Sequence, residues 1–156
     1  MSTRSSRVSY AKAAPGTYRA MLGLEEYLHG CGLEENLLDL ARIRASQLNG
    51  CAFCLDMHTK DLRARGETEQ RIYLLDAWRE APFYSDRERA ALAWTEAVTL
   101  LPGRDVPDEV YDEARQRFSD EELANLTLAI VAINGWNRLN VAFRTPAGTY
   151  QPRVRN

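Results

Sequence analysis

Two cysteines separated by two residues, Cys51 and Cys54, are followed by His58. On a helix each residue advances by about 100° around the axis, so these three side chains would fall within an arc of roughly 60°. The i to i+4 spacing places His58 within reach of the Cys54 proton. Unpaired amides at a helix start favour a thiolate. The spacing therefore predicts a redox-active dithiol in which Cys54 attacks a substrate, Cys51 resolves the product and His58 moves a proton.

Peroxide reduction is the chemistry that such a set would perform. A thiolate that attacks a peroxide yields an alcohol and a sulfenic acid, and a neighbouring thiol condenses with that acid to form a disulfide. An external dithiol then reopens the disulfide by exchange. No step of this cycle needs a metal, a flavin or a nucleotide, so we expect no cofactor.

Three other interpretations of the cysteine pair stay open at this point. A redox sensor or disulfide-exchange module would use the same dithiol with a protein partner, and a reduced pair can also be purely structural. A zinc site would need a fourth ligand in addition to Cys51, Cys54 and His58. The candidates for that ligand are Asp39, Asp61 and His29. Because no second C-x-x-C is present, we favour the redox interpretation and expect no metal.

Composition places the chain among ordinary globular proteins. Of its 156 residues, 45% are hydrophobic and 27% are charged, which suits one domain with a substantial core. The formal charge of −2 offers no basic field for nucleic acid and no polybasic patch for a membrane surface. The longest apolar run, Leu126 to Ile133, is far too short to span a bilayer. The first residues lack the apolar segment of a secretory signal, so we expect a cytoplasmic protein.

The elements that must position the dithiol are predicted to be helices throughout, because no stretch alternates with the period of a strand. Ser85 with Glu88 and Ser119 with Glu122 form the S-x-x-E pattern of a capping box, which marks two helix starts. The expected helices cover residues 15–29, 34–48, 51–66, 68–79, 85–100, 107–118 and 119–143. We expect an N-terminal arm over 1–14, a single helical domain over 15–145 and an extended or frayed tail over 146–156.

The stretch LARIRASQLNGCAFCLDMHTKDLRARGET closely resembles the core motif of the alkylhydroperoxidase D-like branch of the carboxymuconolactone decarboxylase family. The resemblance continues through ERAALAWTEAVTL and ELANLTLAIVAINGWNRLNVAF and covers roughly residues 15 to 145. It implies an all-α fold with the dithiol at a buried helix start. It also implies a homo-oligomer, often a trimer or hexamer, that reduces alkyl hydroperoxides or hydrogen peroxide with electrons from a lipoyl- or thioredoxin-like dithiol partner. The decarboxylase branch acts on a lactone without a cysteine pair, and is the competing activity.

Carried over to this sequence, the resemblance makes Cys54 the peroxidatic thiol, Cys51 its partner and His58 the nearest member of a proton relay. The relay's glutamate, twelve residues before the first cysteine, corresponds to Asp39, whose shorter side chain would need a bridging water. Phe53 stands where some members carry a histidine, which makes the mouth of the pocket more apolar.

Several other residues could carry chemistry but have simpler interpretations. Cys31 is a lone thiol in a turn, and His29 is expected to cap a helix end. Glu96 lies in an apolar helix and would contact the active site, a partner subunit or solvent. Core or subunit-interface packing is expected for the tryptophans Trp78, Trp94 and Trp136. We expect buried hydrogen bonding at a subunit contact for the polar groups Asn134, Asn137, Arg138 and Asn140.

Overall fold

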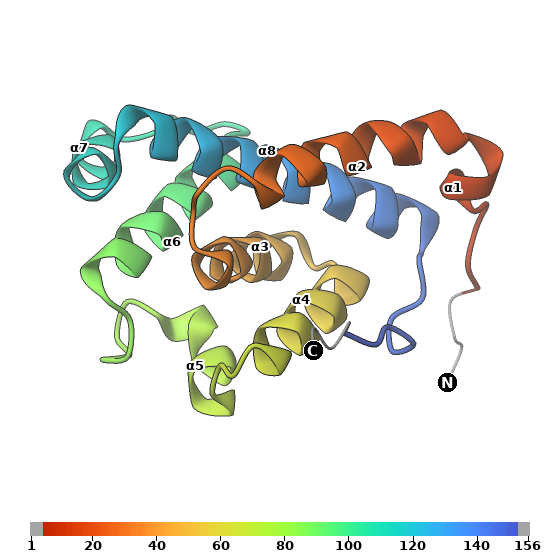
Figure 1. The fold of residues 1–156 in the computed structure, drawn as a ribbon, viewed down its shortest axis with the longest axis horizontal. Coiled ribbons are helices and arrows are strands. Elements are labelled where there is room, and N and C mark those ends of the chain that lie inside the picture. Colours follow the sequence, from red (N-terminus) through yellow and green to blue (C-terminus); the bar gives the residue numbers. More distant parts are fainter. Residues whose placement is uncertain (1–4, 153–156) are drawn as a thin grey trace.

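The computed structural model describes residues 5–152, and every regular element in that range is a helix (Figure 1). This confirms the predicted all-α class. The elements in chain order are α1 (Tyr10–Ala13), α2 (Pro15–His29), α3 (Glu35–Asn49), α4 (Ala52–Ala64), α5 (Glu69–Tyr73), the 3-10 turn η1 (Leu75–Ala77), α6 (Asp86–Thr99), α7 (Asp108–Arg117) and α8 (Asp120–Phe143).

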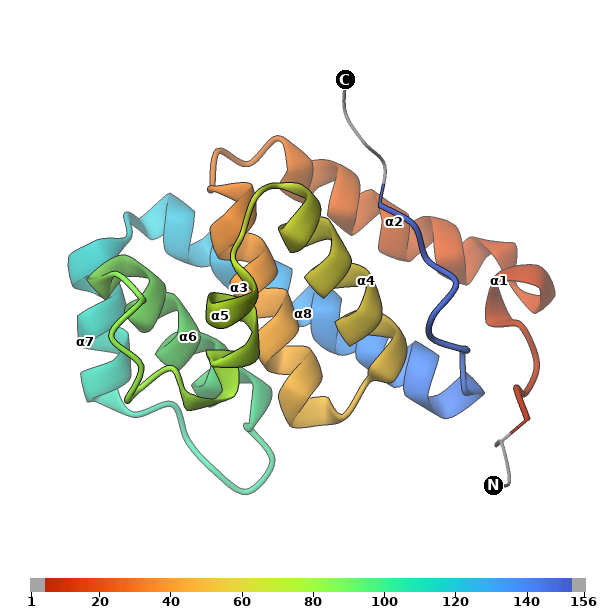
Figure 2. The ribbon, with the colours of Figure 1, turned by 90° about the horizontal axis from the view of Figure 1, so that it is seen from below.

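Helix α3 lies at the centre of the molecule. Residues 37–46 are buried without interruption, so this helix is covered on all sides rather than along one stripe. It packs against α4, α6 and α8, and α2 lies along α8 (Figures 1 and 2). Leu38 of α3 and Leu126 and Ile130 of α8 share one apolar cluster. The polar residues that α3 carries into this core therefore need partners inside the protein.

Both predicted capping boxes are present. The Ser85 hydroxyl accepts from the Glu88 amide while the Glu88 carboxylate accepts from the Ser85 amide, and Ser119 and Glu122 repeat the arrangement at the start of α8. Each box satisfies two amides that a helix start would leave unpaired. The start of the long helix α8 is thus fixed at Ser119.

The structure departs from the expected elements at two places, one within residues 68–79 and one in the N-terminal arm. Residues expected as one helix, 68–79, form α5 and then the 3-10 turn η1, which tightens the chain so that Leu75 and Trp78 are both buried. The one-turn helix α1 was not expected within the arm. Residues 1–4 and 153–156 of the expected arm and tail lie outside the described range.

The described part of the tail, residues 145–152, contains no helix but is attached to α4. The Gly148 amide donates to Asp56 (3.0 Å), Lys60 donates to the Tyr150 carbonyl (3.0 Å), and the Tyr150 hydroxyl donates to Asp61 (2.7 Å). The tail therefore lies beside α4. Within the described residues, no helix combines the length and apolar character that crossing a membrane requires.

Candidate active site

The two cysteines meet at the junction of α3 and α4. Gly50 ends α3 in the left-handed conformation, with φ of 66°, which a glycine adopts without strain. The turn makes Cys51 the N-cap of α4, where its sulfur accepts from the Cys54 amide at 3.4 Å. The two sulfurs are 2.7 Å apart, and the residues are 1% and 0% exposed. The predicted dithiol at a buried helix start is thus present.

The two thiols differ in acidity: Cys51 loses its proton first, and Cys54 keeps its own. The hydrogen bond from the Cys54 thiol, together with the Cys54 amide, lowers the pKa of Cys51 to about 7 against the opposing effect of burial. The pKa of Cys54 is raised, first because its proton is held by Cys51 and then by burial. The pair as a whole loses its first proton near pH 7, and the negative charge that this leaves lies mainly on the Cys51 sulfur.

The two cysteines also differ in their access to the cavity, and this difference favours Cys54. Cys54 lines a cavity of about 880 Å³ and Cys51 does not. A small molecule in the cavity would therefore meet Cys54 first. The assignment of Cys54 as the attacking sulfur stays a prediction, and it requires that the charge pass from Cys51 to Cys54.

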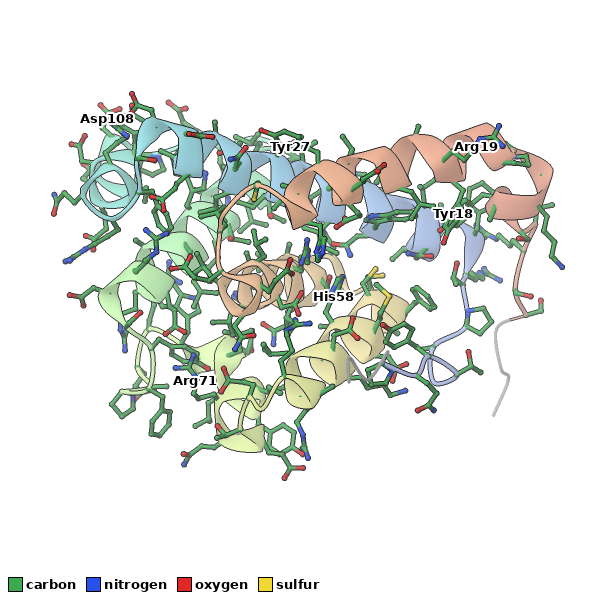
Figure 3. All side chains as sticks on the ribbon, in the orientation of Figure 1. Tyr18, Arg19, Tyr27, His58, Arg71 and Asp108 are labelled. Carbon is green, nitrogen blue, oxygen red and sulfur yellow. The ribbon has the colours of Figure 1, made fainter. Side chains whose placement is uncertain are left out.

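His58 projects from α4 toward α3 and lines the same cavity (Figure 3). Its Nδ1 lies 3.4 Å from Asp39 Oδ1. Burial lowers the pKa of His58 to about 4, and the Arg42 guanidinium contributes to the same shift. The imidazole is therefore neutral at neutral pH and can accept or relay a proton.

Asp39 lies 2% exposed in α3, and its carboxylate is held by two guanidinium groups. Arg42 donates to its Oδ1 at 3.0 Å, and Arg65 forms an ion pair with its Oδ2. The carboxylate approaches His58 Nδ1 to 3.4 Å without a hydrogen bond between them, because this buried nitrogen has no hydrogen-bond partner within residues 5–152, so the bridging water stays a prediction. Arg42 also pairs with Glu25 at 3.0 Å, which extends the charged network onto α2.

Sequence reasoning missed the contribution of α8 to this site. Asn137 and Asn140 were expected at a subunit contact, but they lie within the chain beside the dithiol. Asn137 donates to the Ser46 hydroxyl (3.0 Å) and also lowers the pKa of Cys51 by a hydrogen bond. Asn140 donates to the Cys54 sulfur at 3.5 Å. The available signal was their spacing, because residues 134, 137 and 140 recur every three positions on an otherwise apolar helix.

Glu96 belongs to a separate charged cluster and does not line the cavity. It accepts from Arg44 (2.8 Å), from the Trp78 indole (2.8 Å) and from Arg79 (2.6 Å). These hydrogen bonds outweigh burial and lower the pKa of Glu96, so it stays ionised. Glu96 therefore joins helices α3 and α6 to the chain around η1.

The remaining candidates also have defined places. Cys31 is half-buried against the core, away from the cavity. His29 is the last residue of α2 and contacts Glu35 at 3.2 Å. Trp78 and Trp94 are buried, whereas Trp136 lines the cavity and donates to Glu25 at 3.0 Å. Among residues 5–152, no three side chains of His, Cys, Asp or Glu converge in an arrangement that could hold a metal ion.

The wall of the cavity combines apolar and charged groups. Its apolar side includes Val8, Tyr10, Tyr18, Leu22, Phe53, Met57, Trp136 and Phe143. Its charged side includes Glu25, Glu35, Asp39, Arg42, Asp61 and Arg65. Phe53, at the position between the cysteines, makes the wall beside Cys54 apolar, as the sequence predicted.

Comparison with known proteins identifies the family. The model of the carboxymuconolactone decarboxylase family matches residues 15–97. The uncharacterised protein YdfG of Bacillus subtilis is 46% identical over 145 residues, which cover 93% of this chain and 99% of that protein. A crystal structure from Agrobacterium tumefaciens, described as a putative antioxidant defence protein AhpD, superposes with a TM-score of 0.90. It is 45% identical and covers 94% of this chain and 100% of its own.

More distant structures share the fold. The debrominase Bmp8 superposes with a TM-score of 0.77 at 22% identity, over 88% of this chain and 74% of its own. At that identity the likeness extends to the fold alone. The family match, the Bacillus relative and the Agrobacterium structure agree with one another and with the motif around the dithiol. The chain therefore belongs to the carboxymuconolactone decarboxylase family, in its alkylhydroperoxidase D-like branch.

Proposed function

We propose that this protein is a thiol-dependent peroxidase that reduces alkyl hydroperoxides, and more slowly hydrogen peroxide, through a dithiol and disulfide cycle. The observation that carries the proposal is the sulfur pair itself. The two sulfurs are 2.7 Å apart, the pKa of Cys51 is lowered to about 7, and Cys54 lines a cavity that also contains a neutral histidine. The likeness to a putative antioxidant defence protein supports the same activity.

The first half of the cycle oxidises Cys54. After the pair has lost one proton to solvent, the remaining proton passes from Cys54 to Cys51, so that Cys54 carries the negative charge and faces the cavity. Its thiolate attacks one oxygen of the hydroperoxide, the S–O bond forms and the O–O bond breaks. The alkoxide leaves as an alcohol after His58, held beside Asp39, relays a solvent proton to it.

The second half forms the disulfide. The Cys51 thiol attacks the sulfur of the sulfenic acid, the S–S bond forms, and the departing hydroxide leaves as water with the Cys51 proton. Two electrons have then passed from the dithiol to the peroxide. An external dithiol of the lipoyl or thioredoxin type returns them by exchange. Because both cysteines are buried, a slender dithiol that enters through the cavity suits the site better than a rigid surface thiol.

The cavity supports an apolar substrate. Its volume of about 880 Å³ greatly exceeds that of hydrogen peroxide, and aromatic side chains form much of its wall. An alkyl or aryl hydroperoxide would bury its apolar body there and gain binding free energy of roughly 25 cal/mol per Å². We therefore expect kcat/KM for cumene hydroperoxide to exceed that for hydrogen peroxide. We also propose, from the family resemblance, a cytoplasmic homo-oligomer.

Stopped-flow mixing of the reduced protein with cumene hydroperoxide tests the activity. Cys54→Ser is expected to abolish peroxide consumption, and Cys51→Ser to permit one turnover without disulfide formation. Cys31→Ser is the matched control, because this third cysteine lies outside the cavity, and it should react like the parent protein. Consumption that survives Cys54→Ser would overturn the assignment.

A disulfide-exchange module is the second candidate, and the low pKa of Cys51 favours it because a thiolate near pH 7 exchanges readily. This candidate predicts fast reaction with a small disulfide and negligible peroxide turnover. Measuring both rates on the same reduced sample separates the two functions.

A further inference from the structure

A chain of two hydrogen bonds links the N-terminal arm to the Cys54 sulfur. The Tyr10 hydroxyl donates to Asn140 Oδ1 at 3.3 Å, and Asn140 Nδ2 donates to Cys54 Sγ at 3.5 Å. The three residues come from α1, α8 and α4, and the first two are separated by 130 positions. Asn140 is only 4% exposed, so its amide must find its partners within the protein.

A negative charge on Cys54 fixes the donor and acceptor directions of these two hydrogen bonds. A side-chain amide has a donor end and an acceptor end, and only the donor end stabilises a thiolate. When Cys54 carries the negative charge, Asn140 must therefore turn its oxygen away from the sulfur and toward Tyr10. Burial raises the pKa of Tyr10, which keeps its O–H available as the donor that this oxygen needs.

Contacts between the arm and the end of α8 hold Tyr10 in place. Its ring packs against Phe143 with centroids 5.6 Å apart. Three residues before the start of α1, the Arg7 amide donates to the Phe143 carbonyl (3.0 Å) and the Arg7 guanidinium donates to the Ala142 carbonyl (2.8 Å). The hydroxyl of Tyr10 is thus fixed relative to the end of α8, where Asn140 lies.

We infer that Asn140 and Tyr10 are positioning residues of the dithiol, with Asn140 stabilising the thiolate form of Cys54 and Tyr10 fixing the orientation of the Asn140 amide. This inference rests on the proposed function to the extent that Cys54 is the attacking sulfur. It makes the N-terminal arm a part of the active site rather than an extension of the domain.

Other titratable and charged groups lie beside Cys54 or line the same cavity. They are Cys51, His58 and Asp61 near or on α4, Arg65 just after it, Glu35, Asp39 and Arg42 on α3, Tyr18, Glu25, Glu26 and His29 on α2, Arg7 in the arm and Tyr150 in the tail. On the side of α8 the neighbouring polar groups are the neutral amides of Asn137 and Asn140. Changing Asn140 or Tyr10 to an apolar residue therefore alters a hydrogen bond and leaves these charges in place.

The test measures the pH at which Cys54 becomes a thiolate. In a background of Cys31→Ser and Cys51→Ser, alkylation of the one remaining thiol by iodoacetamide is followed against pH by mass spectrometry. Losing a hydrogen bond to a charged group is expected to move the midpoint up by about one pH unit in Asn140→Ala. Tyr10→Phe, which keeps the ring packing on Phe143, should produce a smaller rise in the same direction.

The structure supplies a matched control. The Tyr27 hydroxyl donates to Asn125 Oδ1 at 3.0 Å, which is the same pairing of a tyrosine with an α8 asparagine, outside the cavity that Cys54 lines. Tyr27→Phe should leave the alkylation midpoint unchanged. Because Tyr10 acts through Asn140, adding Tyr10→Phe to Asn140→Ala should cause no further rise.

Three results would overturn the inference. They are coincident alkylation profiles for Tyr10→Phe and the parent background, an equal shift in Tyr27→Phe, or a full further shift when Tyr10→Phe is added to Asn140→Ala. Alkylation needs no peroxide, so its outcome is independent of whether the protein proves to be a peroxidase. A shifted profile without peroxidase activity would support the inference while the proposed function failed.

Discussion

Acidification is expected to destabilise this protein through His58. Burial and the Arg42 guanidinium hold the pKa of His58 at about 4 in the folded protein, against 6.5 for an ordinary imidazole. Between these two values the unfolded chain binds a proton that the folded protein excludes. The stability that His58 contributes is therefore complete above pH 6.5 and is lost as the pH falls toward 4. The total loss is about 3 kcal/mol, of which about 2 kcal/mol is lost by pH 5.

Urea denaturation at pH 7.5 and at pH 5 measures this loss as a difference in the free energy of unfolding. His58→Gln replaces the imidazole with a side chain that does not titrate, so its stability should fall by about 2 kcal/mol less than that of the parent between the two pH values. The control is His29→Gln, which replaces the other histidine of the sequence at an exposed position and should keep most of the parental loss. If His58→Gln loses as much stability as the parent, the imidazole is not held neutral by the fold.

Three further predictions follow from other parts of the structure. The rate of alkyl hydroperoxide consumption should rise to a plateau with one midpoint near pH 7, because the hydrogen bond from Cys54 lowers the pKa of Cys51 to about 7; stopped-flow rates across pH would show this. Gly50→Ala, at a φ of 66°, should cost about 1 kcal/mol in urea denaturation, whereas Gly23→Ala, inside exposed helix α2 with nothing within 4 Å, should gain up to about 1 kcal/mol. Equal effects of the two would contradict the backbone argument. Glu96→Gln should lower the free energy of unfolding by about 2 kcal/mol, because the buried Arg44 guanidinium loses this carboxylate and keeps only that of the exposed Asp76, while the thiol alkylation profile stays unchanged.

The parts of the site that could be predicted are those encoded by local spacing. Cys51, Cys54 and His58 lie on one short segment, so helical geometry alone placed them together. The capping boxes at Ser85 and Ser119 were equally visible, because each is complete within four residues. Asp39 came from the family resemblance, and the structure brings its carboxylate to 3.4 Å from His58.

The contacts that escaped prediction join distant parts of the chain. Asn140 lies 86 residues from Cys54, and no periodicity in either helix encodes that pairing. The asparagines of α8 indicated buried hydrogen bonds correctly, but the sequence could not tell a contact within one chain from a contact between subunits. Glu96 escaped for the same reason, because its partners come from two other segments of the chain, Arg44 in α3 and the adjacent Trp78 and Arg79 after η1.

The short distance between the two sulfurs has a consequence for the resistance of Cys54 to overoxidation. A sulfenic acid formed on Cys54 has its reaction partner 2.7 Å away from the moment it appears. Conversion to the irreversible sulfinic acid requires a second peroxide to enter the cavity and react before Cys51 does. Condensation within the pair does not depend on peroxide concentration, whereas that second attack does. Hyperoxidation should therefore remain a minor fate of the protein even at peroxide doses that inactivate thiols without so close a neighbour.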